Sequence, residues 1–251
     1  MIVRRIREHI QRQDWFALAL DFVIVVVGVF VGLQAQDWNT NRAERAAEKD
    51  ALARLITEYQ VNLGILDYDR ERSVRSEKAT NTLIGMISPD PAPVTVNATL
   101  NETFSNIFTN PKFVPNLGTT NSLIASGDIR LIRDPEIQRL LTQWPTTAQT
   151  MIEWQEIERM HSEELILGYT FNYVAWPDFH HIDSEYSMEN FGDVPDSLLE
   201  SDFNGLLSSK RFEGMLANRR SNLRFSVARI DALKEDTQEL IDLMQERLDN
   251  L

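Results

Sequence analysis

The sequence predicts an all-α protein in which one N-terminal transmembrane helix continues into an extramembrane antiparallel helix bundle. Three observations lead to this prediction. An apolar run from Phe16 to Leu33 contains a single charge, helical periodicities recur between residues 39 and 251, and no alternating pattern indicates a strand. The expected organisation is a basic N-terminus that is cytoplasmic or lies in the membrane interface (residues 1–14), a transmembrane helix (15–38) and an extracytoplasmic helical bundle domain (39–251).

Two tryptophans bracket the apolar run and indicate where it meets the membrane surfaces. A helical rise of about 1.5 Å per residue places about 34 Å between Trp15 and Trp38. This length matches a hydrocarbon core of about 30 Å flanked by interfacial aromatic residues. The bulky Leu33 makes Leu33-Gln34-Ala35 a poor signal-peptidase site, so the pattern favours a retained anchor over a cleaved signal peptide.

Orientation follows from a small excess of positive charge before the span. The N-terminal segment 1–14 carries four arginines, and three basic residues follow the span within residues 39–49. The positive-inside rule therefore favours a cytoplasmic N-terminus. The expected location is the bacterial inner membrane, crossed once, with the bulk of the chain in the periplasm.

One face of the predicted span is small and polar rather than lipid-like. Spacings of four and three residues place five side chains on a single helical stripe. A Gly-x-x-x-Gly pair allows two helix backbones to approach closely, and a carboxylate at this depth is tolerable in a seam between helices. Partial exposure of the carboxylate to interfacial water is the alternative. The predicted membrane helix interface consists of Asp21, Val25, Gly28, Gly32 and Ala35.

The same layout resembles the peptide-type subunits of ion-driven motors, the stator and energy-transducer families. Those proteins have a cytoplasmic N-terminus, a single span and an acid early in the helix. The resemblance implies a proton-carrying role for Asp21. Nothing downstream has the pattern of a peptidoglycan-binding α/β domain.

The region after the span predicts helices in the following order. A long helix over 39–87 carries one apolar face, which the charged patch 67–78 blurs, and a proline-rich segment at 88–93 ends it. Short helices are expected near 100–108 and 119–126. Asp134 as N-cap, followed by Pro135, begins the next helix, which should stop at Trp144-Pro145.

Two further long helices complete the bundle. The segment from Thr147 to about Ala175 is helical, and a final helix over 210–251 carries a seven-residue ladder interrupted by Thr237. Residues 176–206 form a long connection between them. The side chains expected to share one face of the first of these helices are Trp154, Ile157, His161, Leu165, Gly168 and Phe171.

Composition excludes several classes of function. The net charge is −13, of which residues 1–36 contribute +1 and residues 37–251 contribute −14, so nucleic acid is not an expected partner. The absence of cysteine removes disulfides, thiolate nucleophiles and cysteine-based metal sites. The expected partners are the lipid bilayer and either this chain itself or other membrane protein subunits.

No catalytic, cofactor or metal site is predicted. Glu158-x-x-His161 has the spacing of half a di-iron site but lacks a second such pair, so a core or edge histidine is the preferred interpretation. Adjacent histidines in the acidic connection could hold a cation but are more typical of a solvated loop. Its interleaved aromatic residues suggest a partner-docking loop instead. The residues of that loop are Phe179, His180, His181, Tyr186 and Phe191.

Two stretches resemble a family of uncharacterised bacterial single-pass membrane proteins. The first is G-V-F-V-G-L-Q-A-Q-D-W-N over 28–39, and the second is the serine-glycine turn and helix start over 126–134. Family members pair a basic N-terminus and an acid early in the span with a G-x-x-x-[AG]-L-Q-x-x-x-W-N ending. The resemblance implies a helical extramembrane domain and brings no activity with it. This chain has Asp21 where the family tends to have glutamate.

These observations favour a non-enzymatic, membrane-anchored helical protein that acts as a self-associating scaffold or an accessory subunit of a larger membrane complex. One alternative is an extracytoplasmic sensory or ligand-binding helical module. Another is a subunit of an ion-driven membrane motor that uses Asp21.

Overall fold

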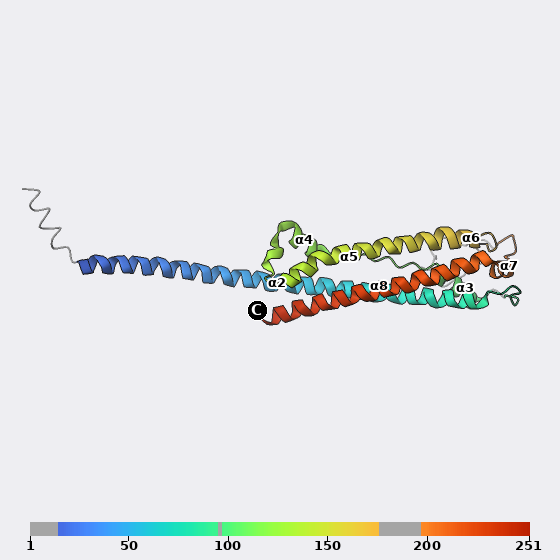
Figure 1. Cartoon of the computed structure of the whole chain (residues 1–251), viewed down its shortest axis with the longest axis horizontal. Helices are drawn as coiled ribbons and strands as arrows, with labels where there is room; N and C mark the ends of the chain where they lie inside the picture. The colour runs from blue at the N-terminus through green and yellow to red at the C-terminus, as the bar shows by residue number, and fades with distance from the viewer. Residues whose placement is uncertain (1–14, 95–96, 176–196) are drawn as a thin grey trace, which may run out of the picture.

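The computed structural model describes residues 15–94, 97–175 and 197–251, and within these ranges every regular element is a helix (Figure 1). The predicted all-α class and the long apolar N-terminal helix are confirmed. The elements are α2 (Trp15–Met86), α3 (Ala98–Ile107), α4 (Gly118–Ser126), the 3₁₀ turn η1 (Asp128–Leu131), α5 (Pro135–Met160), the π-helical segment η2 (His161–Leu167), α6 (Gly168–Thr170), α7 (Phe203–Leu207) and α8 (Lys210–Asp249).

Helix α2 is a single uninterrupted helix of 72 residues. Its interior contains no proline, and strong helix formers fill the stretch where the apolar run gives way to polar residues. It ends at Met86, two residues before Ser88-Pro89, where the ring of the proline cannot continue a helix. The first half of α2 projects alone, and the rest of the molecule gathers along the second half (Figure 1).

Helix α8 packs along the second half of α2 and runs in the opposite direction. Three ion pairs show this, because residue numbers rise on one helix as they fall on the other. The pairs are Glu48 with Arg247 at 2.9 Å, Arg70 with Asp231 at 2.6 Å, and Glu77 with Arg224 at 2.7 Å.

Helix α5 begins where the sequence predicts and ends later. The Asp134 carboxylate accepts the backbone N–H groups of Glu136 and Ile137, which makes it the N-cap. The expected break at Pro145 is wrong, because α5 passes through that residue and continues to Met160. Trp144 and Ala148 on either side of the proline are both buried, so packing holds the helix together across the missing backbone donor.

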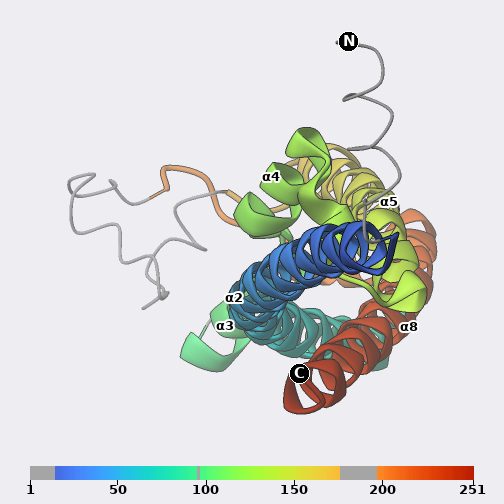
Figure 2. The same ribbon diagram turned by 90° about the vertical axis from the view of Figure 1, so that its left-hand side faces the viewer.

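The three long helices arrange their buried positions at alternating spacings of three and four residues, the spacing typical of helices packed at shallow angles. Viewed along the molecule, α2, α5 and α8 surround a common axis (Figure 2). The buried positions that follow this spacing are 48, 52, 55, 59, 62, 66, 69, 73, 76, 80 and 83 on α2; 137, 141, 144, 148, 151, 155 and 158 on α5; and 212, 216, 219, 223, 226, 230, 233, 237, 240 and 244 on α8. Five further described residues of these three helices are buried beside them: Ala51, Ile56, Glu58, Ala79 and Ile241.

Two separate apolar cores result. The near core, next to the projecting part of α2, joins α2 residues 51–66, α5 residues 137–151 and α8 residues 230–244. The distal core joins the end of α2, α3, α7 and the start of α8. Between α2 and α5, the segment 108–117 fills the remaining space: Phe113 packs edge-on against Trp144, and Asn62 and Asn116 exchange two hydrogen bonds of 2.8 and 2.7 Å.

Candidate functional site

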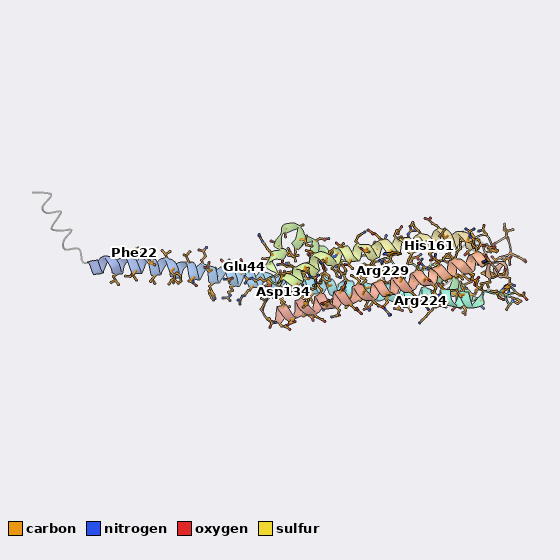
Figure 3. The ribbon with its side chains drawn as sticks, viewed as in Figure 1. Phe22, Glu44, Asp134, His161, Arg224 and Arg229 are labelled. Atoms are coloured by element: carbon orange, nitrogen blue, oxygen red, sulfur yellow. The ribbon has the colours of Figure 1, made fainter. Side chains whose placement is uncertain are left out.

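The first candidate site is the projecting part of α2. Every residue from Phe22 to Ala46 is exposed to solvent. This helix has an 18-residue window of mean hydropathy 1.4 with none of it buried, and it is the single candidate span by length and composition among the described residues. Phe22 is 70 % exposed, and its side chain points away from the helix with no neighbouring element (Figure 3). An apolar surface of this size needs a cover that the described part of the chain does not supply.

The predicted interface residues lie on this projecting part. Val25 is 63 % exposed, and Ala35 is exposed as well. Trp38 is 68 % exposed, and the guanidinium of Arg42 sits 5.9 Å from its ring centroid. The backbones of Trp15 and Asp21 belong to α2, while their side chains lie outside the described part. The predicted docking loop, Phe179, His180, His181, Tyr186 and Phe191, lies within 176–196 and therefore outside the described residues.

Gly28 and Gly32 have no structural requirement within this chain. A Cβ atom added at either position would meet no atom within 4 Å, and neither residue has a positive φ. Glycine in a helix interior nevertheless destabilises the helix by about 1 kcal/mol relative to alanine. No contact within the described residues therefore explains why glycine stands at these two positions.

The junction between the projecting helix and the bundle is held by a buried carboxylate. Glu48 is fully buried and accepts hydrogen bonds from Arg247 Nε at 2.9 Å and Nη2 at 3.1 Å, and from the Arg133 backbone N–H at 2.9 Å. Burial raises the pKa of Glu48, but the hydrogen bonds from Arg247 and Arg133 outweigh it and hold the pKa below its usual value. Arg133 also reaches Glu44 at 2.6 Å. These contacts bind the C-terminus of α8 and the start of α5 to α2.

The second candidate site is a buried polar layer between the two apolar cores. At this level the alternating spacing continues on all three long helices, but the buried side chains change from apolar to polar. We call this group the polar layer. Its members are Asp69, Ser73 and Ser76 on α2; Gln155, Glu158 and Ser162 on α5 and η2; and Arg219 and Ser226 on α8.

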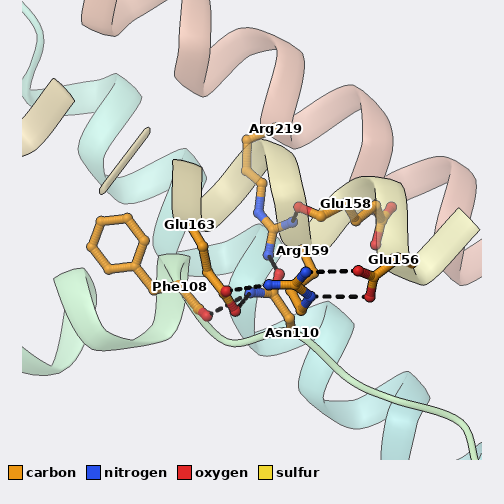
Figure 4. A network of polar contacts seen from close by, with 7 residues as sticks. All are labelled: Phe108, Asn110, Glu156, Glu158, Arg159, Glu163 and Arg219. Atoms are coloured by element: carbon orange, nitrogen blue, oxygen red, sulfur yellow. Dashed lines mark hydrogen bonds and ion pairs between the residues drawn. The ribbon is translucent and has the colours of Figure 1, made fainter. Parts of the chain in front are cut away.

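Arg219 is the central cation of the polar layer and is 1 % exposed. Its Nη2 donates to the Thr109 carbonyl at 2.9 Å, to Asn110 Oδ1 at 2.9 Å and to Ser76 Oγ at 3.4 Å. Its Nη1 donates to the backbone carbonyl of Glu158 at 3.5 Å (Figure 4). Burial lowers the pKa of Arg219 to about 10, which leaves it charged at neutral pH. The guanidinium therefore ties α8 to α2, α5 and the 108–117 segment together.

Glu158 is the acid that α5 contributes to the polar layer, and it is 4 % exposed. Its backbone carbonyl, not its carboxylate, is the group that Arg219 contacts. Burial raises the pKa of Glu158 to about 7, and Arg219 and a hydrogen bond with Ser226 only partly offset this effect. Nearby, the exposed acids Glu156 on α5 and Glu163 on η2 both pair with Arg159, at 2.6 and 2.5 Å (Figure 4).

Two donors in the polar layer have no partner. Arg219 Nε and Ser73 Oγ are both buried without a hydrogen bond, although such groups are nearly always satisfied in folded proteins. The layer also borders η2, in which the backbone follows the wider π-helical turn. That turn keeps Ser162, Ile166 and Thr170 pointing inward at a spacing of four residues.

The Glu158-x-x-His161 pair does not act as a unit in the structure. Glu158 is buried, with Ser226 and Arg219 of α8 beside it, whereas His161 on η2 is only half-buried. Among the described residues, no group of three histidine, aspartate or glutamate side chains could hold a metal ion.

No protein-family model, curated protein or solved structure matches the chain. The resemblance to a single-pass membrane family therefore stays a prediction.

Sequence reasoning missed the polar layer because its members look like ordinary surface residues. One signal could have found it. Arg219 and Ser226 stand at the three- and four-residue offsets between Leu216, Leu223 and Ile230, which are the core positions of the α8 ladder.

Proposed function

We propose that this chain is a membrane-anchored helical protein without catalytic activity, which acts as a self-associating scaffold or as an accessory subunit of a larger membrane assembly. In this proposal the first part of α2 spans the inner membrane of a bacterium, the N-terminus lies in the cytoplasm, and residues 39–251 form an antiparallel helix bundle in the periplasm. The partners are the lipid bilayer and either a second copy of this chain or other membrane subunits.

The observation that carries the proposal is the uncovered apolar helix. A 72-residue helix whose residues 22–33 are all apolar and all exposed is stable in water only if lipid or another chain covers it. Polar side chains resume at Gln34, and the first charge after the apolar run is Asp37, which supports a polar boundary of the proposed span near Trp38.

The glycine pair supports association through one face of that helix. Glycine at positions 28 and 32 has no explanation within the described chain, but a second helix packed against this face would require small side chains there. Val25 and Ala35 extend the same face, and Asp21 lies on it one turn before Val25.

Replacement of both glycines tests the association. We expect the double variant Gly28→Leu/Gly32→Leu to lose chemical crosslinking between chains in lipid nanodiscs. The matched control is Val23→Leu/Val26→Leu, which adds the same side chains on the opposite face of the helix. The control should crosslink as the wild type does.

A cysteine pair provides a direct measure, because the chain contains no native cysteine. Ala35→Cys should form an intermolecular disulfide under mild oxidation, whereas Asp37→Cys, on the other side of the helix, should not. Equal crosslinking at both positions, or association that survives both glycine substitutions, would contradict the proposed interface.

A further inference from the structure

The polar layer divides the bundle into two parts that are stabilised separately. The near core and the distal core share no residue, and the level between them contains an arginine, two acids, a glutamine and four serines where the rest of the seam is mostly apolar. Apolar burial supplies most of the stability of a helix bundle. The layer is therefore the place where cooperativity along the bundle is weakest.

The contacts of the layer can be rearranged without new groups entering it. Arg219 directs its two terminal nitrogens at carbonyl, amide and hydroxyl oxygens, and the Glu158 carboxylate is not among them. An ionised buried carboxylate requires several donors. The unpartnered Arg219 Nε and Ser73 Oγ are donors within the same layer.

We propose that the polar layer is a pH-sensitive joint: ionisation of Glu158 loosens the hold of Arg219 on the 108–117 segment and lets the distal core open while the near core stays folded. The adjacent π-helical segment η2 assists this opening, because a π turn can return to α-helical register by a small slip of the backbone.

The charged groups around Glu158 only partly offset the effect of its burial. From α8 it faces Arg219 and Arg229, both of which lower its pKa, and the Arg229 guanidinium stacks 4.4 Å from the Trp154 ring centroid. From α2 the layer contains Asp69, which Gln155 contacts at 3.4 Å and which lies near Arg72. The 108–117 segment contributes the uncharged Thr109 carbonyl and Asn110 amide. The neighbours along its own helix are Glu156, Arg159, His161 and Glu163.

Burial raises the pKa of both acids of the layer, and the pKa of Glu158 reaches about 7, so this side chain changes charge between pH 6 and 8. A carboxyl with a pKa near 7 when closed and near 4.5 when open raises the opening constant by about tenfold across that interval.

Hydrogen–deuterium exchange of the full-length protein in nanodiscs tests the joint. After correction for the pH dependence of intrinsic exchange, peptides from 100–110 and 159–170 should open about tenfold more readily at pH 8 than at pH 6. Peptides from the near core, 137–151 and 233–244, should show equal protection at both pH values.

Glu158→Gln is the decisive variant, because glutamine keeps the shape of the neutral carboxyl and cannot ionise. It should remove the pH difference in the distal peptides. Glu163→Gln, an exposed acid of the same helical stretch, is the matched control and should retain the difference.

A second measurement keeps the proposal testable if Glu158→Gln folds poorly. Infrared difference spectra of the wild type should show a protonated carboxyl band at pH 6 that disappears by pH 8. Equal distal protection at the two pH values, a pH response that persists in Glu158→Gln, or equal opening of both cores would overturn the proposal. The test does not depend on self-association, so it distinguishes the joint from the membrane interface.

Discussion

Thr237→Val probes the contact that joins α5 to α8 within the near core. Trp144 is 3 % exposed, and its indole Nε1 donates to Thr237 Oγ1 at 2.9 Å. The same hydroxyl donates to the Leu233 carbonyl at 2.5 Å, so Thr237 both accepts and donates while fully buried. Valine preserves the shape of threonine but leaves the buried indole N–H without an acceptor.

The expected magnitude follows from that orphaned donor. Leaving a buried polar group unsatisfied lowers the free energy of unfolding by about 1–3 kcal/mol. The Leu233 carbonyl loses only an additional donor, because it already lies within a helix, so its contribution is small. For a domain of this size, each kcal/mol lowers Tm by roughly 2–4 °C.

A double-mutant cycle measures the contact itself. Thermal unfolding followed by far-ultraviolet circular dichroism would compare the wild type with Thr237→Val, Trp144→Phe and the double variant. Thr237→Val should have little effect in the Trp144→Phe background, because no indole N–H remains to be orphaned. Thr237→Ser retains the hydroxyl and should keep most of the stability. An equal loss in both backgrounds would refute the assigned hydrogen bond.

Two further predictions concern the junction and a turn. Arg247→Leu should lower the unfolding free energy by about 2 kcal/mol near neutral pH, because it leaves the buried Glu48 carboxylate short of donors. The pKa of Glu48 is held below its ordinary value, so the stability that its ionised form contributes is present above pH 4.5 and is lost as the pH falls below that value. Chemical denaturation at about pH 7 and about pH 4 would measure this. The difference in unfolding free energy between the variant and the wild type should be smaller at the lower pH. Gly127→Ala should destabilise the chain by about 1–2 kcal/mol, because φ is +76° there. Gly64→Ala, the same change in an open helical position, should instead stabilise the chain by up to about 1 kcal/mol. Thermal melts should therefore show a lower Tm for Gly127→Ala and a higher Tm for Gly64→Ala, and shifts in the same direction would contradict the prediction.

The helical class and the position of most helices could be predicted from the sequence because these depend on local patterns. Proline-rich ends, the Asp134 cap and the seven-residue ladder of α8 are all visible in a single chain. The ladder position that looked like an interruption, Thr237, is a core position after all. Its partner Trp144 is distant in sequence, so the reason for a threonine there could not be predicted.

The charged patch 67–78 shows where hydropathy fails. It appeared to blur the apolar face of the helix, yet Asp69, Ser73 and Ser76 keep the alternating spacing of three and four residues and are buried. The geometry of the seam continues while its chemistry changes. A search for apolar periodicity detects the change to polar residues but misses that the same positions stay buried.

The buried face of the second half of α5 was harder still to predict from the sequence. Ile157, Leu165 and Phe171, expected on one shared face, are 41–49 % exposed, while Gln155 and Glu158 point inward. The groups they meet there are distant in sequence: Gln155 accepts the Phe113 backbone N–H at 2.7 Å, and Arg219, 61 positions away, contacts the backbone carbonyl of Glu158. The π-helical turn then shifts the register of everything beyond it, which no local pattern announces.

The unbroken backbone of α2 makes the molecule a lever. A helix of 72 residues is about 108 Å long, and it has no hinge between the projecting end and the far tip of the bundle. A tilt of about 5° at one end, pivoting there, therefore displaces the other by about 9 Å. Because Glu48 also binds the start of α5 and the end of α8 to α2, such a tilt would carry the adjoining ends of all three helices together.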